Sequence, residues 1–291
     1  MRKILVLVLA LILALSMGAA FAEEQESGWK NILLLGGDAR NMEKYDRTDM
    51  MMILSINRDE AQVKMTSVMR DTWVPIPGMG RSDKINAANV YGGPELAVET
   101  VNQSFGTDIE DYVIINMEDW LQIVDLLGGV DIEITEKERN QINDYISSYM
   151  SEVAGASSYE GEKWLGETGL VHLNGLMAMS YCRIRLIDSD YVRVMRQQKV
   201  MLALAEKAQN MEIDELTQVA GEIYDIVKTT LSEDEIKSLA TAFMVMEVSE
   251  VGQNRVPVDG TFQSGTFSGT WMIKPDLEKN KALLHEYIYG E

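Results

Sequence analysis

The sequence predicts an α/β fold, specifically an α/β/α sandwich with a central mixed sheet. Short apolar runs that end at glycine, such as residues 31–35 before Gly36 and Gly37, are typical of buried strands. Segments with helical patterns separate these runs, and strands that alternate with helices form layered α/β domains. Hydrophobic residues make up 46% of the 291 residues and charged residues 25%, a globular composition that excludes a disordered chain.

The first half of the chain alternates strand and helix patterns. Pro94 is well placed as the first residue of a helix, where its missing N–H costs nothing. The expected elements are strands at 31–35, 49–57 and 62–69, a polar hairpin at 58–61, a loop at 75–80, a helix at 94–105, a strand at 111–116, a helix at 117–127, a strand at 130–134 and a surface helix at 136–150.

The second half is predicted to be mainly helical. Two stretches rich in small residues are expected to lack regular structure because they carry turn-forming residues without an apolar period. The expected elements are a Gly/Ser-rich excursion at 151–169, helices at 174–180 and 189–210, two more helices after 211, a Gly/Ser/Thr-rich stretch at 260–270 and a closing helix at 276–289.

The amino end has the pattern of an export signal. Arg2 and Lys3 precede an almost wholly apolar run over 4–21, and Ala20-Phe21-Ala22 fits a signal peptidase site. We therefore expect a signal peptide at 1–22. The alternative is an uncleaved membrane anchor, since the run is about as long as the ~18 residues at which a spanning helix becomes plausible. Either way, the remainder lies outside the cytoplasm, secreted or anchored at the outer face of the membrane.

The charge balance argues against nucleic acid as a partner. Asp and Glu total 46 against 26 Lys and Arg, so the formal net charge is −20 and repels phosphate backbones. Cys182 is the one cysteine, which excludes an intrachain disulfide and a cysteine-based zinc cluster. We expect it to be a small buried side chain and not a nucleophile. No phosphate-binding glycine loop of the nucleotide-binding types is present.

Two charged clusters follow predicted strands. Asp38 and Asp49 straddle one loop, and paired carboxylates there would suit Mg²⁺, although two solvated loop acids are an equally simple interpretation. Arg70 stands beside Asp71 just after the strand at 62–69. This pair is either a local ion pair or a guanidinium aimed at a phosphate, which the planar Arg fork binds well.

A third cluster reverses the sign of the whole chain. Residues 183–199 carry five cations and two carboxylates, a net charge of +3. Arg183 and Arg185 would share a face in an extended segment, and Arg193, Arg196 and Gln197 would share a face of a helix. The cluster is either a solvated basic stripe or an anion site for a phosphate or pyrophosphate.

Several motifs together resemble the LytR–CpsA–Psr family of bacterial envelope proteins. They occur in the family's order over about residues 30–205. The matching stretches are Asn31–Arg40 (NILLLGGDAR), Arg47–Met52 (RTDMMM), Ser67–Thr72 (SVMRDT), Asp83–Ala88 (DKINAA), Tyr91–Leu96 (YGGPEL), Gly128–Asp131 (GGVD), Leu173–Gly175 (LNG), Tyr181–Arg185 (YCRIR) and Arg193–Lys199 (RVMRQQK).

The resemblance implies a catalytic domain at 30–205 with an apolar channel for a polyprenyl lipid. We expect a C-terminal helical extension at 206–291, packed on the same domain. The implied activity is a phosphotransferase that moves a glycopolymer from a polyprenyl-pyrophosphate carrier to peptidoglycan, forming a phosphodiester at the membrane surface. Two alternatives stay open: a protein that binds or hydrolyses the carrier without ligase activity, and an envelope-related transcriptional attenuator.

The resemblance also implies site residues. Asp38 and Asp49 correspond to ligands of Mg²⁺, or alternatively Mn²⁺, and together with Arg70 to the catalytic set. The implied pyrophosphate-binding residues are Arg40, Arg70, Lys84, Asn86, Arg183, Arg185, Arg193, Arg196 and Gln197.

Overall fold

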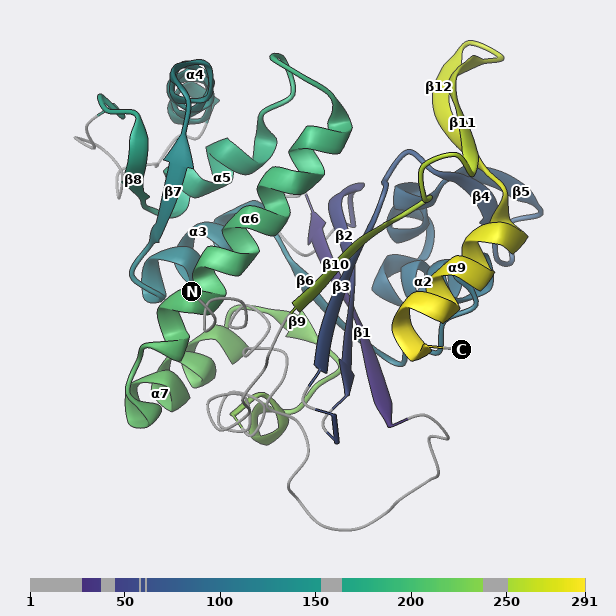
Figure 1. Ribbon diagram of the computed structural model, residues 1–291, viewed down its shortest axis with the longest axis horizontal. Helices are drawn as coiled ribbons and strands as arrows, with labels where there is room; N and C mark the ends of the chain where they lie inside the picture. The colour runs from purple at the N-terminus through teal and green to yellow at the C-terminus, as the bar shows by residue number, and fades with distance from the viewer. Residues whose placement is uncertain are drawn as a thin grey trace.

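A six-stranded mixed sheet forms the centre of the protein (Figure 1). The computed structural model describes residues 28–37, 45–57, 59–60, 62–152, 164–237 and 251–290. In sheet order the strands are β10 (Val251–Val256), β3 (Gln62–Val68), β2 (Thr48–Asn57), β1 (Trp29–Gly37), β6 (Asp111–Ile115) and β9 (Lys228–Thr229). The β1 strand is antiparallel to β2 and parallel to β6, and β10 is parallel to β3, so the predicted mixed sheet is confirmed.

Helices cover both faces of this sheet, and the described residues also form three two-stranded sheets around it. The helices are α2 (Ala88–Phe105), α3 (Met117–Leu126), α4 (Glu136–Glu152), α5 (Gly175–Arg183), α6 (Asp190–Gln209), α7 (Ile213–Tyr224) and α9 (Leu277–Tyr289), with a 3₁₀ turn at Ile85–Ala87. The two-stranded sheets are β4 (Trp73–Ile76) with β5 (Arg81–Lys84), β7 (Val130–Ile134) with β8 (Gly169–Leu173), and β11 (Phe262–Phe267) with β12 (Thr270–Pro275).

The alternation of side chains along β1 explains the three layers. Ile32 and Leu34 belong to a core shared with α3, α5, α6 and α7, whereas Leu33 and Leu35 belong to a second core shared with α2 and α9. Successive side chains of a strand point to opposite faces. A strand buried on both faces must therefore be apolar at every position, which is why this run lacks alternation.

The structure corrects the predicted C-terminal extension. The described residues of the 206–291 segment (206–237 and 251–290) do pack on the same domain, but they are only partly helical. They supply β9 and β10 to the central sheet and form the β11–β12 hairpin within the predicted Gly/Ser/Thr-rich stretch. The β10 strand lies at the sheet edge, where one side needs no partner strand, so its polar centre (Gly252 to Arg255) carries no apolar alternation to reveal it.

Three smaller predictions also need correction. The predicted loop at 75–80 begins within β4, and only residues 77–80 form the turn of the β4–β5 hairpin. The predicted excursion at 151–169 overlaps the end of α4 and the first residue of β8. Arg183 is the last residue of α5, so it does not share an extended segment with Arg185. Pro94 does open a helical segment, because α2 is kinked at the preceding residues Gly92 and Gly93.

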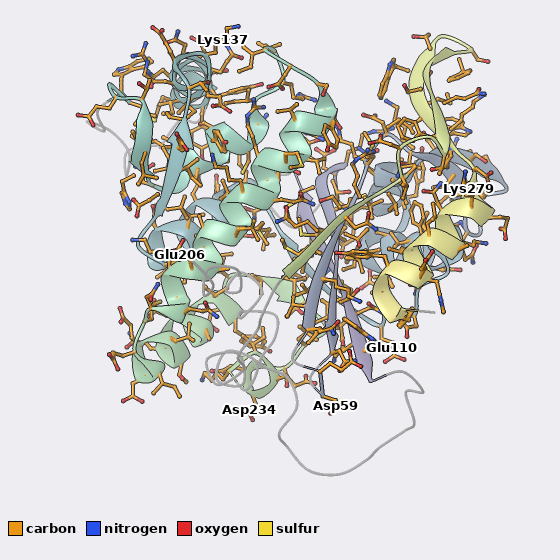
Figure 2. The ribbon with its side chains drawn as sticks, in the orientation of Figure 1. Asp59, Glu110, Lys137, Glu206, Asp234 and Lys279 are labelled. Atoms are coloured by element: carbon orange, nitrogen blue, oxygen red, sulfur yellow. The ribbon has the colours of Figure 1, made fainter. Side chains whose placement is uncertain are left out.

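The predicted signal at 1–22 lies outside the described residues. Within the part of the chain that is described, no helix is both long and apolar enough to cross a bilayer. Charged side chains such as Asp59, Lys137 and Lys279 lie at the periphery and point away from the cores (Figure 2).

The C-terminal helix is predicted to stabilise the whole unit. Leu284 on α9 is fully buried in the core that includes Leu33 and Leu35. We expect Leu284→Ala to lower the free energy of unfolding by about 2–5 kcal/mol, because it removes buried methyl groups and leaves a cavity. Urea denaturation measures this change.

The matched control is Lys279→Ala on the exposed face of the same helix, which should change stability by less than about 0.5 kcal/mol. An equally small effect of Leu284→Ala would mean that α9 is not integral to the domain.

Candidate functional site

A pocket opens where β1 ends and β2 begins, between α3, α5 and α6. Its volume is about 90 Å³. Predicted site residues from three separate parts of the sequence line it, namely Asp49, Arg183, Arg185, Arg193 and Gln197. The fold therefore brings these five predicted residues together. A solvated basic stripe is excluded for Arg193, whose side chain is only 2% exposed.

Carboxylates hold Arg193, which lines the pocket, and Arg70, which lies next to it and is not a lining residue. Arg70 pairs with Asp49, and its guanidinium also lies 3.8 Å from Asp190 and 3.5 Å from Asp71. Arg193 Nη2 lies 3.0 Å from Asp190 Oδ1, and Arg193 Nη1 lies 4.0 Å from Asp49 Oδ2. Asp49 and Asp190 thus each contact both arginines, and the four side chains form one network that spans β2, the end of β3 and α6.

The two arginines respond differently to this environment. Burial acts to lower the pKa of Arg70, but Asp49, Asp190 and Asp71 outweigh it and raise that pKa. For Arg193, burial dominates and lowers the pKa, despite the opposing charges of Asp190 and Asp49. The Nε atom of Arg193 has no hydrogen-bond partner among the described residues. Arg193 therefore gains from an added anion, since buried charge without full pairing is costly.

Arg196 lies away from the pocket, contrary to the expected shared helix face. Its Nε donates to Glu138 Oε1 at 2.9 Å, its Nη1 donates to the Ile184 carbonyl at 3.3 Å, and its Nη2 pairs with Asp188. These partners belong to α4 and to the loop between α5 and α6. Arg196 thus fixes the loop that carries Arg185 and has no donor directed at the pocket.

Lys84 and Asn86 both pair with other side chains of the protein. Lys84 Nζ lies 2.6 Å from Asp71 Oδ1, and Asn86 Oδ1 accepts a hydrogen bond of 3.0 Å from Arg47. Neither residue lines the pocket. Asp71 connects Lys84 to Arg70.

Asp38 and Arg40, which were also predicted to act here, lie outside the described residues.

Sequence reasoning missed the roles of Asp190 and Glu138. In the sequence-based prediction, the acidic residues near the arginines were used only for the net charge of the segment. The spacing of Asp190 could have predicted its role, because Asp190 is three residues before Arg193 on α6, which is an ion-pair spacing on a helix. Glu138 is 58 residues from Arg196 in sequence, and no local pattern links the two residues.

A second pocket, of about 50 Å³, adjoins the first on its inner side. Met50, Ile115 and Trp120 line both pockets. The remaining lining residues are all hydrophobic: Leu34, Leu35, Val113, Ile123, Met201, Ile223, Val227 and Ile236. The site therefore has a cationic entrance and an apolar interior, as a ligand with a charged head and a hydrocarbon tail requires.

Cys182 lines the charged pocket without being activated. Burial raises the pKa of its thiol to about 12, so the thiolate is scarce at neutral pH. The structure corrects the expectation of a buried side chain, since Cys182 is partly exposed at the pocket; that it is not a nucleophile stays a prediction.

Comparison with known proteins gives the family. A model of the LytR_cpsA_psr family matches residues 15–286. The chain belongs to this family. The match extends well past residue 205, in agreement with the contribution of the C-terminal region to the central sheet.

One curated family member is the Bacillus mycoides protein named polyisoprenyl-teichoic acid–peptidoglycan teichoic acid transferase TagU. It is 34% identical over 224 residues, which cover 76% of this chain and 66% of that protein. The chain thus spans slightly less than two thirds of the length of that relative.

Solved structures of the family have the same fold. The crystal structure of B. subtilis TagT superposes with a TM-score of 0.69 at 25% identity, covering 94% of this chain and 95% of that one. A structure of YwtF (TagT) with bound octaprenyl pyrophosphate lipid superposes with a TM-score of 0.65 at 25% identity, covering 92% and 94% of the two chains.

The structure predicts that Arg196 and Arg185 contribute differently to stability. We expect Arg196→Ala to lower the free energy of unfolding by about 3–5 kcal/mol, because it leaves Glu138 and Asp188 without their buried cation. Arg185 is exposed and lines the pocket, so Arg185→Ala should change stability by less than about 0.5 kcal/mol.

Chemical denaturation of both variants provides the comparison. Equal losses of stability in the two variants would contradict the assignment of a structural role to Arg196 and a ligand-binding role to Arg185.

Proposed function

We propose that this protein transfers a cell wall glycopolymer from a polyprenyl-pyrophosphate carrier to peptidoglycan and forms a phosphodiester. One observation carries the proposal: an arginine-lined pocket adjoins a wholly hydrophobic one through Met50, Ile115 and Trp120. The arginines match a pyrophosphate in charge and geometry. The hydrophobic pocket matches a lipid tail, which gains free energy on leaving water.

The relatives support the same reaction. The TagU relative is named as a transferase of teichoic acid from a polyisoprenyl carrier to peptidoglycan. The TagT structure holds an octaprenyl pyrophosphate lipid. A ligand of that class has two chemical parts, and they match the linings of the adjoining pockets, so this chain is proposed to use a polyprenyl-pyrophosphate-linked glycopolymer.

The mechanism is electrostatic and positional. Arg183, Arg185 and Arg193 neutralise the pyrophosphate, with Gln197 as a neutral hydrogen-bond donor and Arg70 orienting Asp49. The acceptor hydroxyl oxygen bonds to the sugar-side phosphorus, the bridging P–O bond breaks, and polyprenyl phosphate leaves with the electron pair. Asp49 or Asp38 accepts the hydroxyl proton. Charge neutralisation and alignment supply most of the catalysis in phosphoryl transfer.

We also propose Mg²⁺ as the cofactor, with Mn²⁺ as the alternative. Asp49 fits as a ligand, because its hard carboxylate oxygens face the pocket and its side chain is 33% exposed. No group of three or more acidic, His or Cys residues within the described ranges forms a metal site. Mg²⁺ commonly uses one or two carboxylates together with substrate phosphates and water, so Asp49 and Asp38 suffice. The bound ion would neutralise phosphate charge.

The location proposed for this activity is the outer face of the cytoplasmic membrane. The carrier lipid resides in the membrane and the acceptor lies outside it. The export signal pattern at 1–22 agrees with that location. A net charge of −20 disfavours nucleic acid binding, which weakens the regulator alternative.

The arginine pocket yields a kinetic prediction. We expect Arg185→Ala to reduce turnover by about 10- to 150-fold, the effect of losing one charge-assisted contact worth about 1.5–3 kcal/mol. The assay measures release of polyprenyl phosphate and attachment of the polymer to a soluble peptidoglycan fragment.

Lys199→Ala is the matched control. Lys199 belongs to the same basic segment, but its ammonium donates to the Glu133 carbonyl at 2.6 Å and does not line the pocket. Turnover of this variant should stay within about twofold of wild type. Equal losses for Arg185→Ala and Lys199→Ala would indicate a surface stripe, and carrier cleavage without attachment would indicate a hydrolase.

The cofactor proposal predicts a divalent-ion requirement. Treatment with a chelator should abolish turnover, and added Mg²⁺ should restore it, because the carboxylates otherwise repel the pyrophosphate. Binding of Mn²⁺, followed by its effect on water proton relaxation, should be lost in Asp49→Asn. Unchanged turnover in the chelator would contradict the metal proposal and leave the arginine pocket unaffected.

A further inference from the structure

A separate groove lies on the other side of α6. Its volume is about 310 Å³, and it shares no lining residue with the two pockets described above. The α6 helix forms one wall and β10 with the residues after it forms the other. The ribbon shows α6 next to β10 (Figure 1). The two walls are tied together by Gln198, whose side chain donates to the Asn254 carbonyl at 3.3 Å and to Ser67 Oγ at 3.0 Å.

The groove presents apolar surfaces beside planar polar groups. Tyr191 and Met195, one helical turn apart on α6, are 46% and 43% exposed. The Arg255 guanidinium lies 4.8 Å from the Tyr191 ring centroid and 5.8 Å from that of Phe262. Its Nε has no hydrogen-bond partner among the described residues. An exposed aromatic ring offers a flat face to an apolar surface while its hydroxyl stays available for hydrogen bonding.

The charges of the groove favour a ligand without strong net charge. Arg255 pairs with Asp259 at 2.6 Å, so the cation and the carboxylate of the lining compensate each other. The exposed side chain of Gln253 adds an amide group that can donate and accept, whereas the amide N–H groups of Gln198 already donate to Ser67 and Asn254. This combination suits a saccharide, which has hydroxyl and amide groups at its edges and apolar C–H faces. A lipid tail would leave the polar groups unpaired.

The groove lies directly beside the arginine network. Arg255 contacts Tyr191 and also Met69, whose sulfur is 3.0 Å from Arg255 Nη1. Met69 and Tyr191 are the sequence neighbours of Arg70 and Asp190. Consecutive Cα atoms are about 3.8 Å apart, so a ligand in the groove lies close to the network. On α6, Arg193 and Gln197 face the charged pocket, whereas Tyr191, Met195 and Gln198 face the groove.

We propose that this groove binds the glycan strand of the acceptor. The inference rests on the proposed function, which requires an acceptor saccharide to approach the pyrophosphate from outside the lipid pocket. The groove supplies an aromatic face, amide groups and a position beside the Arg70–Asp190 end of the arginine network. The sugar chain of the donor has the same chemistry, and the experiment separates the two sources.

The test is a calorimetric titration with two lipid-free probes. One is a soluble peptidoglycan glycan fragment, and the other is the free glycopolymer without lipid or pyrophosphate. Wild-type protein should bind the peptidoglycan fragment. Tyr191→Ala should weaken that binding by about tenfold or more, and Tyr191→Phe, which keeps the ring, should stay within about threefold of wild type.

Two further variants keep the test independent of folding. Met195→Glu places a charge in the groove and keeps the Tyr191 and Arg255 side chains, and it should also weaken binding by about tenfold. Trp164→Ala removes an exposed aromatic side chain that lines none of the three pockets, and it should bind like wild type. Melting temperatures of all variants confirm that each is folded.

The outcomes distinguish a failure of the groove proposal from a failure of the proposed function. Failure of the wild type to bind the peptidoglycan fragment up to about 10 mM, or equal binding by the Tyr191→Ala and Met195→Glu variants, overturns the inference. Binding of only the free glycopolymer, lost in Tyr191→Ala, assigns the groove to the donor and also overturns it. In the same variants polyprenyl pyrophosphate should still raise the melting temperature. Its failure to do so in wild type would overturn the proposed function instead.

Discussion

The pairing of two largely buried arginines with shared carboxylates is the interaction on which the site depends. Arg193 is 2% exposed, and a guanidinium so far from water needs nearby negative charge. Asp190 supplies it from the same helix, and Asp49 supplies it from β2 while also pairing with Arg70. The network therefore requires α6, β2 and the end of β3 to be docked correctly. It holds the cations in place before an anion arrives, which reduces the ordering cost of binding.

The layered fold separates the charged and apolar parts of the site. The ends of β1 and β2 carry the pocket with the arginines, while the side chains deeper on the same sheet face form the hydrophobic pocket against α3, α6 and α7. Every residue of β1 from Ile32 to Leu35 is buried, so this strand separates the core covered by α3, α6 and α7 from the core covered by α2 and α9. Leu35 belongs to the second core and also lines the hydrophobic pocket. On the proposed function, the lipid tail lies in the layer covered by α3, α6 and α7.

Sequence reasoning succeeded where one strong local signal sufficed. The apolar run before Gly36 and the long amphipathic segment at 189–210 predicted β1 and α6 closely. It missed β10, because an edge strand with a polar centre lacks the alternation on which strand prediction depends. It also expected Arg196 at the pocket. Helical spacing fixes the direction of the Cβ atom, but a long side chain can carry its guanidinium to another partner, here Glu138 and Asp188. The substrate class came from the family motifs, since charge patterns alone left a phosphate site and a solvated stripe equally open.

The most direct test of the central claim compares ligands that differ only in the tail. The dissociation constants of a polyprenyl pyrophosphate and of a pyrophosphate with a short alkyl chain can be measured on wild type and on Ile115→Trp. That substitution enlarges a residue at the junction of the two pockets. The account predicts that wild type binds the long-tailed ligand more than about tenfold tighter, since each buried methylene contributes about 0.8 kcal/mol. The variant should lose this preference and retain binding of the short ligand. Equal affinities for both ligands in wild type would contradict the account.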